Sequence, residues 1–204
     1  MFNVCANCGN WHDKREIDPD GAYAICPDCH YHQPFTYLPL FVITGASGAG
    51  KSTVTLALMG QLTNFVLLEG DIFWRGEFNR PVYEYSDFRN ICLRAAKTIN
   101  QSGRPTIISG SATPGEYEAC PEFCYFDGAY YLALVCEEGE LIRRLQARPS
   151  WRQSGSAESI ETMIIFNRWF CEHGDQVTLL DTTYLGVPET AALVKDWLLA
   201  HYSA

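Results

Sequence analysis

Residues 40–53 have the sequence Leu40-Phe-Val-Ile-Thr-Gly45-Ala-Ser-Gly-Ala-Gly50-Lys51-Ser52-Thr53. The apolar run from Leu40 to Thr44 predicts a buried strand, and it leads into a glycine-rich loop that ends in Lys-Ser-Thr. The apolar-periodic residues that follow predict a helix. This is the Gly-x4-Gly-Lys-Ser pattern in a strand–loop–helix setting, and it predicts a phosphate-binding P-loop.

Each residue type in this pattern has a physical reason. The glycines let the backbone curl so that its N–H groups point at a phosphate, and the helix adds the positive end of its dipole. We expect Lys51 to reach the β- and γ-phosphates and the Ser52 hydroxyl to bind Mg²⁺. A glycine-rich turn without a ligand is the alternative. The expected nucleotide-binding residues are Gly45, Ala46, Ser47, Gly48, Ala49, Gly50, Lys51, Ser52 and Thr53.

Length and composition limit the classes of protein to consider. The 204 residues suffice for one α/β domain with a small appendage, and a hydrophobic content of 47% is typical of a globular chain. The net charge of −9 disfavours a nucleic-acid-binding surface, which would be basic. The sequence has neither a membrane-span pattern nor a signal-peptide pattern. We therefore expect a cytoplasmic protein whose nine cysteines are reduced.

Two cysteine pairs near the N-terminus have metal-ligand spacing. Cys5-x2-Cys8 and Cys26-x2-Cys29 are separated by 17 residues, which predicts a four-cysteine zinc ribbon over residues 1–34, followed by a linker over 35–39. Four thiolates leave no open coordination position, so we expect a structural zinc that supplies folding free energy. Two disulfides, or ligation by a nearby histidine, are the alternatives. The ribbon could bind a protein partner, cover the active site or only stabilise the chain.

Residues 65–69 predict a second buried parallel strand that ends in Glu69-Gly70-Asp71. Ligands of open α/β sheets bind at the carboxyl ends of the strands, so Asp71 is a candidate general base and Glu69 could assist Mg²⁺ through water. The next predicted strand ends in Ser109-Gly-Ser111, where a Walker B strand would end in aspartate. This departure disfavours a motor protein or a GTPase. Solvated loop acids are the alternative for both carboxylates.

A helix is expected from Ser86, as its N-cap, to about Gln101. Its expected inward stripe is Phe88, Ile91, Ala95 and Ile99, with Arg89 and Arg94 on the outer side. Further helices are expected over residues 138–147 and 158–173 and from Pro188 onward, with strands over 130–135 and 176–181.

The P-loop followed by a strand that ends in Glu-Gly-Asp resembles the P-loop small-molecule and nucleoside or nucleotide kinases. Adenylylsulfate, shikimate and gluconate kinases and chloramphenicol phosphotransferases share this plan. The resemblance implies a P-loop NTPase domain over residues 40–204, with a five-stranded parallel sheet in a three-layer α/β/α fold. It also implies that Mg²⁺-ATP binds the P-loop and that Asp71 touches the acceptor hydroxyl.

The resemblance further implies an acceptor pocket near Trp74 and Arg75 and an arginine lid around residues 143–157. In such kinases the lid arginines stabilise the transferring phosphoryl group, which here suggests catalytic roles for Arg144 and Arg148 and phosphate contacts for Arg148 and Arg152. Pro149 interrupts this row of arginines. A packed aromatic loop and a helix with surface arginines are the alternatives.

The function expected from these patterns is ATP-dependent transfer of a γ-phosphoryl group to a hydroxyl or phosphate of a small molecule, preferably a nucleoside or nucleotide. The alternative is a regulatory module that binds or hydrolyses NTP and recruits a partner through its zinc ribbon. The choice between ATP and GTP stays open at this stage.

Overall fold

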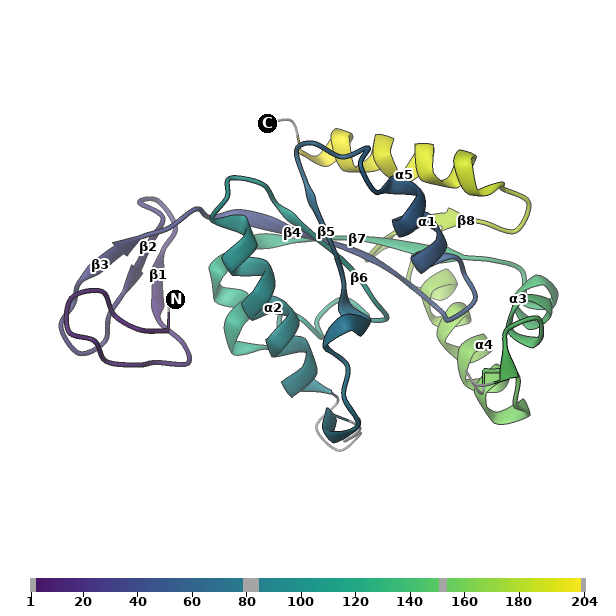
Figure 1. The fold of residues 1–204 in the computed structure, drawn as a ribbon, viewed down its shortest axis with the longest axis horizontal. Coiled ribbons are helices and arrows are strands. Elements are labelled where there is room, and N and C mark those ends of the chain that lie inside the picture. The colour runs from purple at the N-terminus through teal and green to yellow at the C-terminus, as the bar shows by residue number, and fades with distance from the viewer. Residues whose placement is uncertain (1–2, 79–84, 151–153, 203–204) are drawn as a thin grey trace. The chain divides into compact units, whose positions relative to one another are not determined.

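The computed structural model describes residues 3–78, 85–150 and 154–202 (Figure 1). The chain divides into two compact units, each made of segments that are not contiguous in the sequence. The first unit contains Met1–Leu40, Asn64–Ile108 and Pro114–Ala129. The second unit contains Phe41–Thr63, Ser109–Thr113 and Tyr130–Ala204.

The chain forms a five-stranded parallel sheet with the strand order β5-β6-β4-β7-β8 and with helices on both sides. This confirms the predicted α/β fold of the P-loop type. A separate three-stranded sheet has the order β1-β2-β3. The strands of the larger sheet are β4 (Leu38–Gly45), β5 (Val66–Glu69), β6 (Thr106–Ser109), β7 (Phe126–Val135) and β8 (Thr178–Asp181).

In the first unit, the N-terminal segment forms the small antiparallel sheet of β1 (Glu16–Asp18), β2 (Tyr23–Ile25) and β3 (His32–Pro34). Asp18 lies opposite Tyr23, so the Asp-Pro-Asp-Gly turn closes the β1–β2 hairpin. Ala24 in the middle of β2 is fully buried. This sheet is too small to have an apolar core of its own.

The helix α2 (Ser86–Asn100) also belongs to the first unit, and its buried face differs from the prediction. The buried residues are Arg89, Cys92, Leu93, Ala96, Lys97 and Asn100, one position later than the predicted stripe. The expectation that Arg89 faces outward was wrong, because its guanidinium forms an ion pair with Glu116. Ser86 is the first helical residue and not the N-cap, which is Tyr85. The apolar pattern misled the prediction because this helix buries ion pairs.

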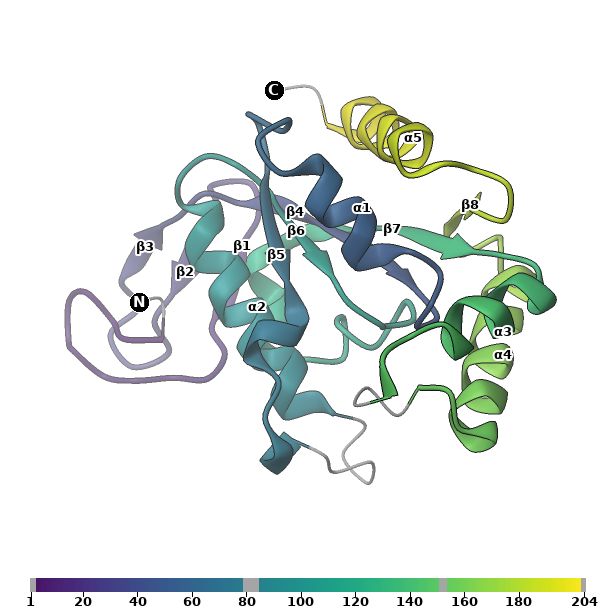
Figure 2. The same ribbon diagram turned by 45° about the vertical axis from the view of Figure 1, so that its right-hand side comes forward.

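The second unit carries the helices α1 (Lys51–Leu58), α3 (Glu138–Gln146), α4 (Ala157–Glu172) and α5 (Val187–His201). Helices α1 and α5 lie side by side in both views, and so do α3 and α4 (Figures 1 and 2). Fully buried Phe41 on β4 packs against Tyr130, Trp197 and Tyr202. No described helix is long and apolar enough to cross a membrane.

Candidate functional site

Gly45 ends β4 in a conformation and a space that only glycine fits. Its φ is +130°, and a Cβ on it would lie 2.2 Å from the backbone oxygen of Leu134. The left-handed φ region is sterically costly for other residues, and the short distance leaves no room for a side chain. The first glycine of the P-loop pattern is therefore needed for the close approach of this loop to β7.

Lys51 begins α1 and folds its side chain across the loop. Its ammonium group donates hydrogen bonds to the carbonyl oxygen of Gly45 at 2.6 Å and to that of Ala46 at 3.2 Å. Ser52 and Thr53 follow in the first helical turn and are exposed, and this turn has no acidic residue. The positive end of the helix is thus not neutralised by a carboxylate of its own turn. All nine predicted nucleotide-binding residues lie on this loop and the turn that follows it.

Helices α3 and α4 pack against the P-loop. Ala46 is fully buried in a cluster with Cys136, Leu141 and Leu145. The backbone N–H of Ser47 donates to the sulfur of Met163 on α4 at 3.2 Å. A loop whose main chain is packed in this way has little conformational freedom, which favours a preorganised anion site.

The segment after β6 is joined to the start of the P-loop by side-chain hydrogen bonds. The hydroxyl of Thr44 donates to the carbonyl oxygen of Ala112 at 2.6 Å and accepts from its N–H at 3.1 Å. The hydroxyl of Ser111 donates to the carbonyl oxygen of Gly45 at 3.2 Å. Strand β6 ends at Ser109, without an acid. The position of a Walker B aspartate is therefore taken by hydroxyl groups that tie backbone segments together.

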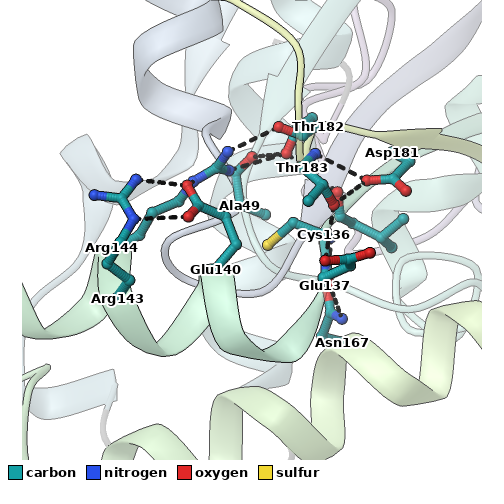
Figure 3. A network of polar contacts seen from close by, with 11 residues as sticks. Ala49, Cys136, Glu137, Glu140, Arg143, Arg144, Asn167, Asp181, Thr182 and Thr183 are labelled. Carbon is teal, nitrogen blue, oxygen red and sulfur yellow. Dashed lines mark hydrogen bonds and ion pairs between the residues drawn. The ribbon is translucent and has the colours of Figure 1, made fainter.

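Arg144 on α3 is linked to the P-loop through Thr182 (Figure 3). Its guanidinium donates to Glu140 at 2.7 Å, to the carbonyl oxygen of Thr182 at 2.7 Å and to the Thr182 hydroxyl at 3.0 Å. The same hydroxyl lies 3.1 Å from the carbonyl oxygen of Ala49. Thr182 is 4% exposed, so it is nearly closed to water, whereas the side chains of Arg144 and Glu140 are partly exposed. The contacts of Thr182 with Arg144 and Ala49 were not predicted from the sequence, although the Asp-Thr-Thr at the end of β8 was a usable signal.

The other arginines of the predicted lid have different surroundings. Arg143 pairs with Glu140 on the exposed side of α3, and hydrogen bonds from Arg143 and then Arg144 lower the pKa of Glu140 to about 2. Arg148 follows the end of α3 and is half-buried. Arg152 lies outside the described residues. The predicted row of three lid arginines therefore stays a prediction.

The predicted acceptor residues lie in the first unit. Glu69 ends β5 and is half-buried, and Asp71 is exposed in the short 3-10 helix η1 (Gly70–Phe73). Burial raises the pKa of Cys92 on α2 to about 12, and the negative charge of Asp71 adds to this rise. Asp71 is thus electrostatically coupled to α2.

Trp74 and Arg75 follow η1 and differ in their environment. The Trp74 ring packs against Tyr85 and Phe88 but is still 43% exposed. The exposed guanidinium of Arg75 lies 3.8 Å from a carboxylate oxygen of Glu77. The two alternatives for this segment, a packed loop and an acceptor pocket, are therefore compatible, because the same aromatic residue is packed and still partly exposed.

The four predicted zinc ligands come together in the first unit. The Sγ atoms of Cys5, Cys8, Cys26 and Cys29 all lie within 4.8 Å of one another. The Cys5–Cys29 distance is 3.6 Å and the Cys8–Cys26 distance is 3.8 Å. With Zn–S bonds of about 2.3 Å, the edges of a ligand tetrahedron would be about 3.8 Å long. The four sulfurs therefore fit a tetrahedral zinc ion.

Thiolate formation is favoured at two of these cysteines. A backbone hydrogen bond from Cys8 lowers the pKa of Cys5 to about 6, and the side-chain amide of Asn7 lowers the pKa of Cys29. A backbone hydrogen bond from Asn10 lowers the pKa of Cys8, but burial and the neighbouring cysteines outweigh it and raise that pKa to about 12. Thiolates are the form that binds a metal. Nearby, His12 is held by Asp28 at 2.9 Å, which in turn accepts from Asn10 at 2.6 Å. The four-sulfur set is complete without this histidine.

Comparisons with known proteins identify the fold. No family model and no curated protein matches the sequence. Solved structures do match, among them the tunicamycin resistance protein of Deinococcus radiodurans, at 17% identity and a TM-score of 0.57 over 79% of this chain and 95% of that chain. A gluconokinase from Sinorhizobium meliloti matches at 20% identity and a TM-score of 0.52, over 82% of this chain and 99% of that one.

Shikimate kinase from Acinetobacter baumannii matches at 14% identity and a TM-score of 0.53, over 83% of this chain and 98% of that one. These likenesses show that the chain has the fold of P-loop small-molecule kinases. About a fifth of the chain has no counterpart in these structures, whereas their own lengths are matched almost completely.

Proposed function

We propose that this protein is an ATP-dependent kinase that transfers a γ-phosphoryl group to a small molecule, with a nucleoside or nucleotide as the preferred acceptor. The observation that carries the proposal is the conformation of residues 45–53. Glycine-only geometry, a lysine folded across the loop and a helix start without acids together form an anion cradle. The fold shared with gluconokinase and shikimate kinase supports a phosphoryl-transfer reaction.

In this mechanism, the N–H groups of residues 45–53 hold the phosphates of ATP. Lys51 leaves its carbonyl partners and binds the β- and γ-phosphates, because a phosphate is a stronger acceptor for an ammonium group than a carbonyl. The exposed Ser52 hydroxyl would hold Mg²⁺, which would neutralise charge on the phosphates. The N–H of Ser47, which donates to the sulfur of Met163, and that of Ala49, which donates to the carbonyl oxygen of Ala46, would have to leave these partners to reach a phosphate.

On the acceptor side, Asp71 accepts the proton of the hydroxyl that attacks the γ-phosphate, and Glu69 would help to hold Mg²⁺ through water. Trp74 and Arg75 bind the acceptor, since an exposed ring edge and a guanidinium suit a flat polar molecule. Asp71 and the P-loop both follow strands of the same parallel sheet. In such sheets, ligand sites form at the carboxyl ends of the strands.

The lid arginines have two roles in the proposed reaction. Arg148 and Arg152 stabilise the charge of the transferring group. Arg144 acts as a positioning residue, because its guanidinium is already bound to Glu140 and Thr182. The zinc site at Cys5, Cys8, Cys26 and Cys29 is structural, and the protein works in the cytoplasm. Recruitment of a protein partner by the ribbon belongs to the alternative function, the regulatory module.

The test is an acceptor screen with Mg²⁺-ATP and nucleosides, nucleotides, sugars and phenicol-type alcohols. We expect acceptor-dependent formation of ADP, and Asp71→Asn should lower it by about 10²–10⁴-fold, the usual contribution of a general base. Glu77→Gln is the matched control, since this carboxylate is exposed and contacts only Arg75 at 3.8 Å among the ion pairs of the described residues. Full activity of Asp71→Asn would contradict the assignment of the base.

A measurement of ATP binding distinguishes the kinase from the alternative function, a regulatory module that binds NTP. Lys51→Ala should weaken ATP binding by about tenfold or more, because a charge-assisted contact to phosphate is lost. A protein that binds ATP but forms no ADP with any acceptor would be a binding module. Turnover with water alone would indicate a hydrolase. Unchanged ATP affinity of Lys51→Ala would contradict nucleotide binding at the P-loop.

A further inference from the structure

Asn3 connects the cysteine site to the interior of the first unit. It lies two residues before Cys5 and is 4% exposed. Its side-chain amide donates to the carbonyl oxygen of His12 at 2.9 Å and to a carboxylate oxygen of Glu122 at 3.3 Å. Its side-chain oxygen accepts from the ammonium group of Lys97 at 2.9 Å. One amide therefore contacts the ribbon and both members of a buried ion pair.

The ion pair between Lys97 and Glu122 belongs to none of the proposed catalytic steps. Lys97 lies on α2, Glu122 lies on the 3-10 helix η4 (Pro121–Tyr125), and each side chain is 1% exposed. Glu122 also accepts from Arg94 at 2.9 Å, and the Lys97 ammonium lies 4.1 Å from the centre of the Tyr125 ring. Buried charges are costly unless their hydrogen bonds are complete, and Asn3 completes this set.

Two further contacts join the N-terminal segment to the same elements. The side chain of Gln101, just after α2, accepts from the N–H of Thr36 at 2.8 Å and donates to its carbonyl oxygen at 3.2 Å. Phe35 packs edge-on against Tyr125 of η4 with the ring centres 5.9 Å apart. The small sheet is therefore attached to α2 and η4 at its beginning and at its end.

We infer that the metal-loaded cysteine site positions α2 through Asn3, so that the ribbon is an internal brace of the acceptor-side unit. The ribbon has no apolar core of its own, so ligation of the metal is what fixes Cys5 and the short segment before it. Once Asn3 is fixed, its amide satisfies Lys97 and Glu122. Loss of the metal releases Asn3 and leaves two buried charges with incomplete hydrogen bonds, which loosens α2.

This brace also bears on the proposed reaction. Helix α2 contacts η1, which carries Asp71, and the charge of Asp71 acts on Cys92 of α2. Asn3, Lys97 and Glu122 are then positioning residues for the general base. This last step rests on the proposed kinase function, whereas the coupling between metal and α2 does not.

Hydrogen exchange of the full-length protein, read by mass spectrometry, tests the coupling. Zinc content is measured first, and the protein is then compared before and after treatment with a zinc chelator. We expect exchange of the amides near Lys97 to rise by about tenfold or more after chelation, since hydrogen bonds to charged groups are lost. Peptides from α4, which belongs to the second unit, should be unchanged.

Asn3→Ala should reproduce the faster exchange in α2 while it retains the zinc. Chelation of Asn3→Ala should then add little, because both changes remove the same link. Asn10→Ala is the matched control, since its side chain contacts Asp28 on the ribbon. It should leave α2 unchanged.

Three results would overturn the inference. They are unchanged exchange in α2 after chelation, an equal effect of chelation in Asn3→Ala and in the parent protein, and an equal rise in α4. If Asn3→Ala does not fold, the chelation experiment on the parent protein alone decides. These outcomes are independent of the acceptor screen, so an inactive protein with metal-dependent exchange in α2 would support the brace and contradict only the kinase.

Discussion

The two units of this protein each contain a cation on a helix that is bound to a carboxylate and to an uncharged side chain, but the two networks differ in their contact with water. In the first unit, Lys97 and Glu122 are both 1% exposed. In the second unit, the side chains of Arg144 and Glu140 are 23% and 19% exposed. The first network lies in the interior, and the second borders the solvent next to the P-loop.

This difference predicts different consequences for the same kind of substitution. Removing one member of a buried pair leaves an uncompensated charge and costs about 3–5 kcal/mol, whereas an exposed pair contributes about 0–1 kcal/mol. We therefore expect the network of Lys97 to determine the stability of the first unit. The network of Arg144 should instead determine the position of Thr182 beside Ala49.

The largest effect is expected for Lys97→Met. Among the described residues, the carboxylate of Glu122 would keep Arg94 and Asn3 as partners, and the free energy of unfolding should fall by about 3–5 kcal/mol. Urea unfolding followed by circular dichroism measures this. The double substitution Lys97→Met/Glu122→Leu should recover much of the loss, because no charge remains buried. Lys195→Met, at a half-buried lysine of α5, is the control and should change stability little. A loss below 1 kcal/mol for Lys97→Met would contradict the contrast between the two networks.

The next largest effect is expected for Gly45→Ala, in the unit of the solvent-exposed network. The new Cβ would overlap the backbone oxygen of Leu134, and the φ of +130° is unfavourable for alanine. We expect a loss of about 2–4 kcal/mol together with weaker ATP binding. Gly60→Ala is the control, with a φ of +75° and open space around the new methyl group. Calorimetry of unfolding and of ATP binding compares the two variants. Equal losses of stability in both would show that the strained φ alone, and not the overlap with Leu134, is the cause.

A smaller effect is expected for Arg144→Ala, which removes both hydrogen bonds to Thr182. The cost should be about 1–2 kcal/mol, with a change in the affinity for ATP that exceeds the change in turnover. Arg143→Ala is the matched control, since this neighbouring arginine pairs with Glu140 but is 68% exposed. It should be nearly neutral. Indistinguishable ATP affinities in the two variants would argue against a positioning role for Arg144.

The smallest effect is a pH dependence at Glu140. Hydrogen bonds from Arg143 and Arg144 lower its pKa from 4.5 to about 2 in the folded protein. A lowered carboxyl pKa stabilises the fold above pH 4.5, and this contribution is lost as the pH falls toward about 2. The difference in Tm between the parent and Glu140→Gln should therefore shrink between pH 5 and pH 3, over roughly that window. A difference that is independent of pH would show that Glu140 acts without its charge.

Local patterns gave reliable predictions wherever the chemistry lies within a few neighbouring residues. The P-loop conformation follows from glycines and a lysine at fixed spacing, and the clustering of the four cysteines follows from two pairs with a turn between them. The apolar runs predicted individual strands, and the resemblance to P-loop kinases implied that they form a five-stranded parallel sheet. The roles of Asp71, Arg148 and Arg152 remain predictions, since they depend on ligands or on residues outside the described ranges.

Contacts between distant residues were beyond the reach of these patterns. The prediction for α2 placed its apolar residues inward, but its interior side carries Arg89 and Lys97, whose partners lie 27 and 25 residues further along the chain. A charged residue can be buried only where a partner meets it, and one sequence does not reveal that partner. The bond between Thr182 and Ala49 was not predicted for the same reason, because it joins positions 133 residues apart.

The carbonyl group of Gly45 has a practical consequence. Its oxygen accepts hydrogen bonds from both Lys51 and Ser111. The electronic environment of this carbonyl therefore depends on the position of the lysine and on that of the segment after β6. A ¹³C label on this one carbonyl would give an NMR signal whose shift reports each departure of the ammonium group. Titration of such a sample with different nucleoside triphosphates would rank purine and pyrimidine nucleotides by their affinity for the P-loop, without any assay of turnover.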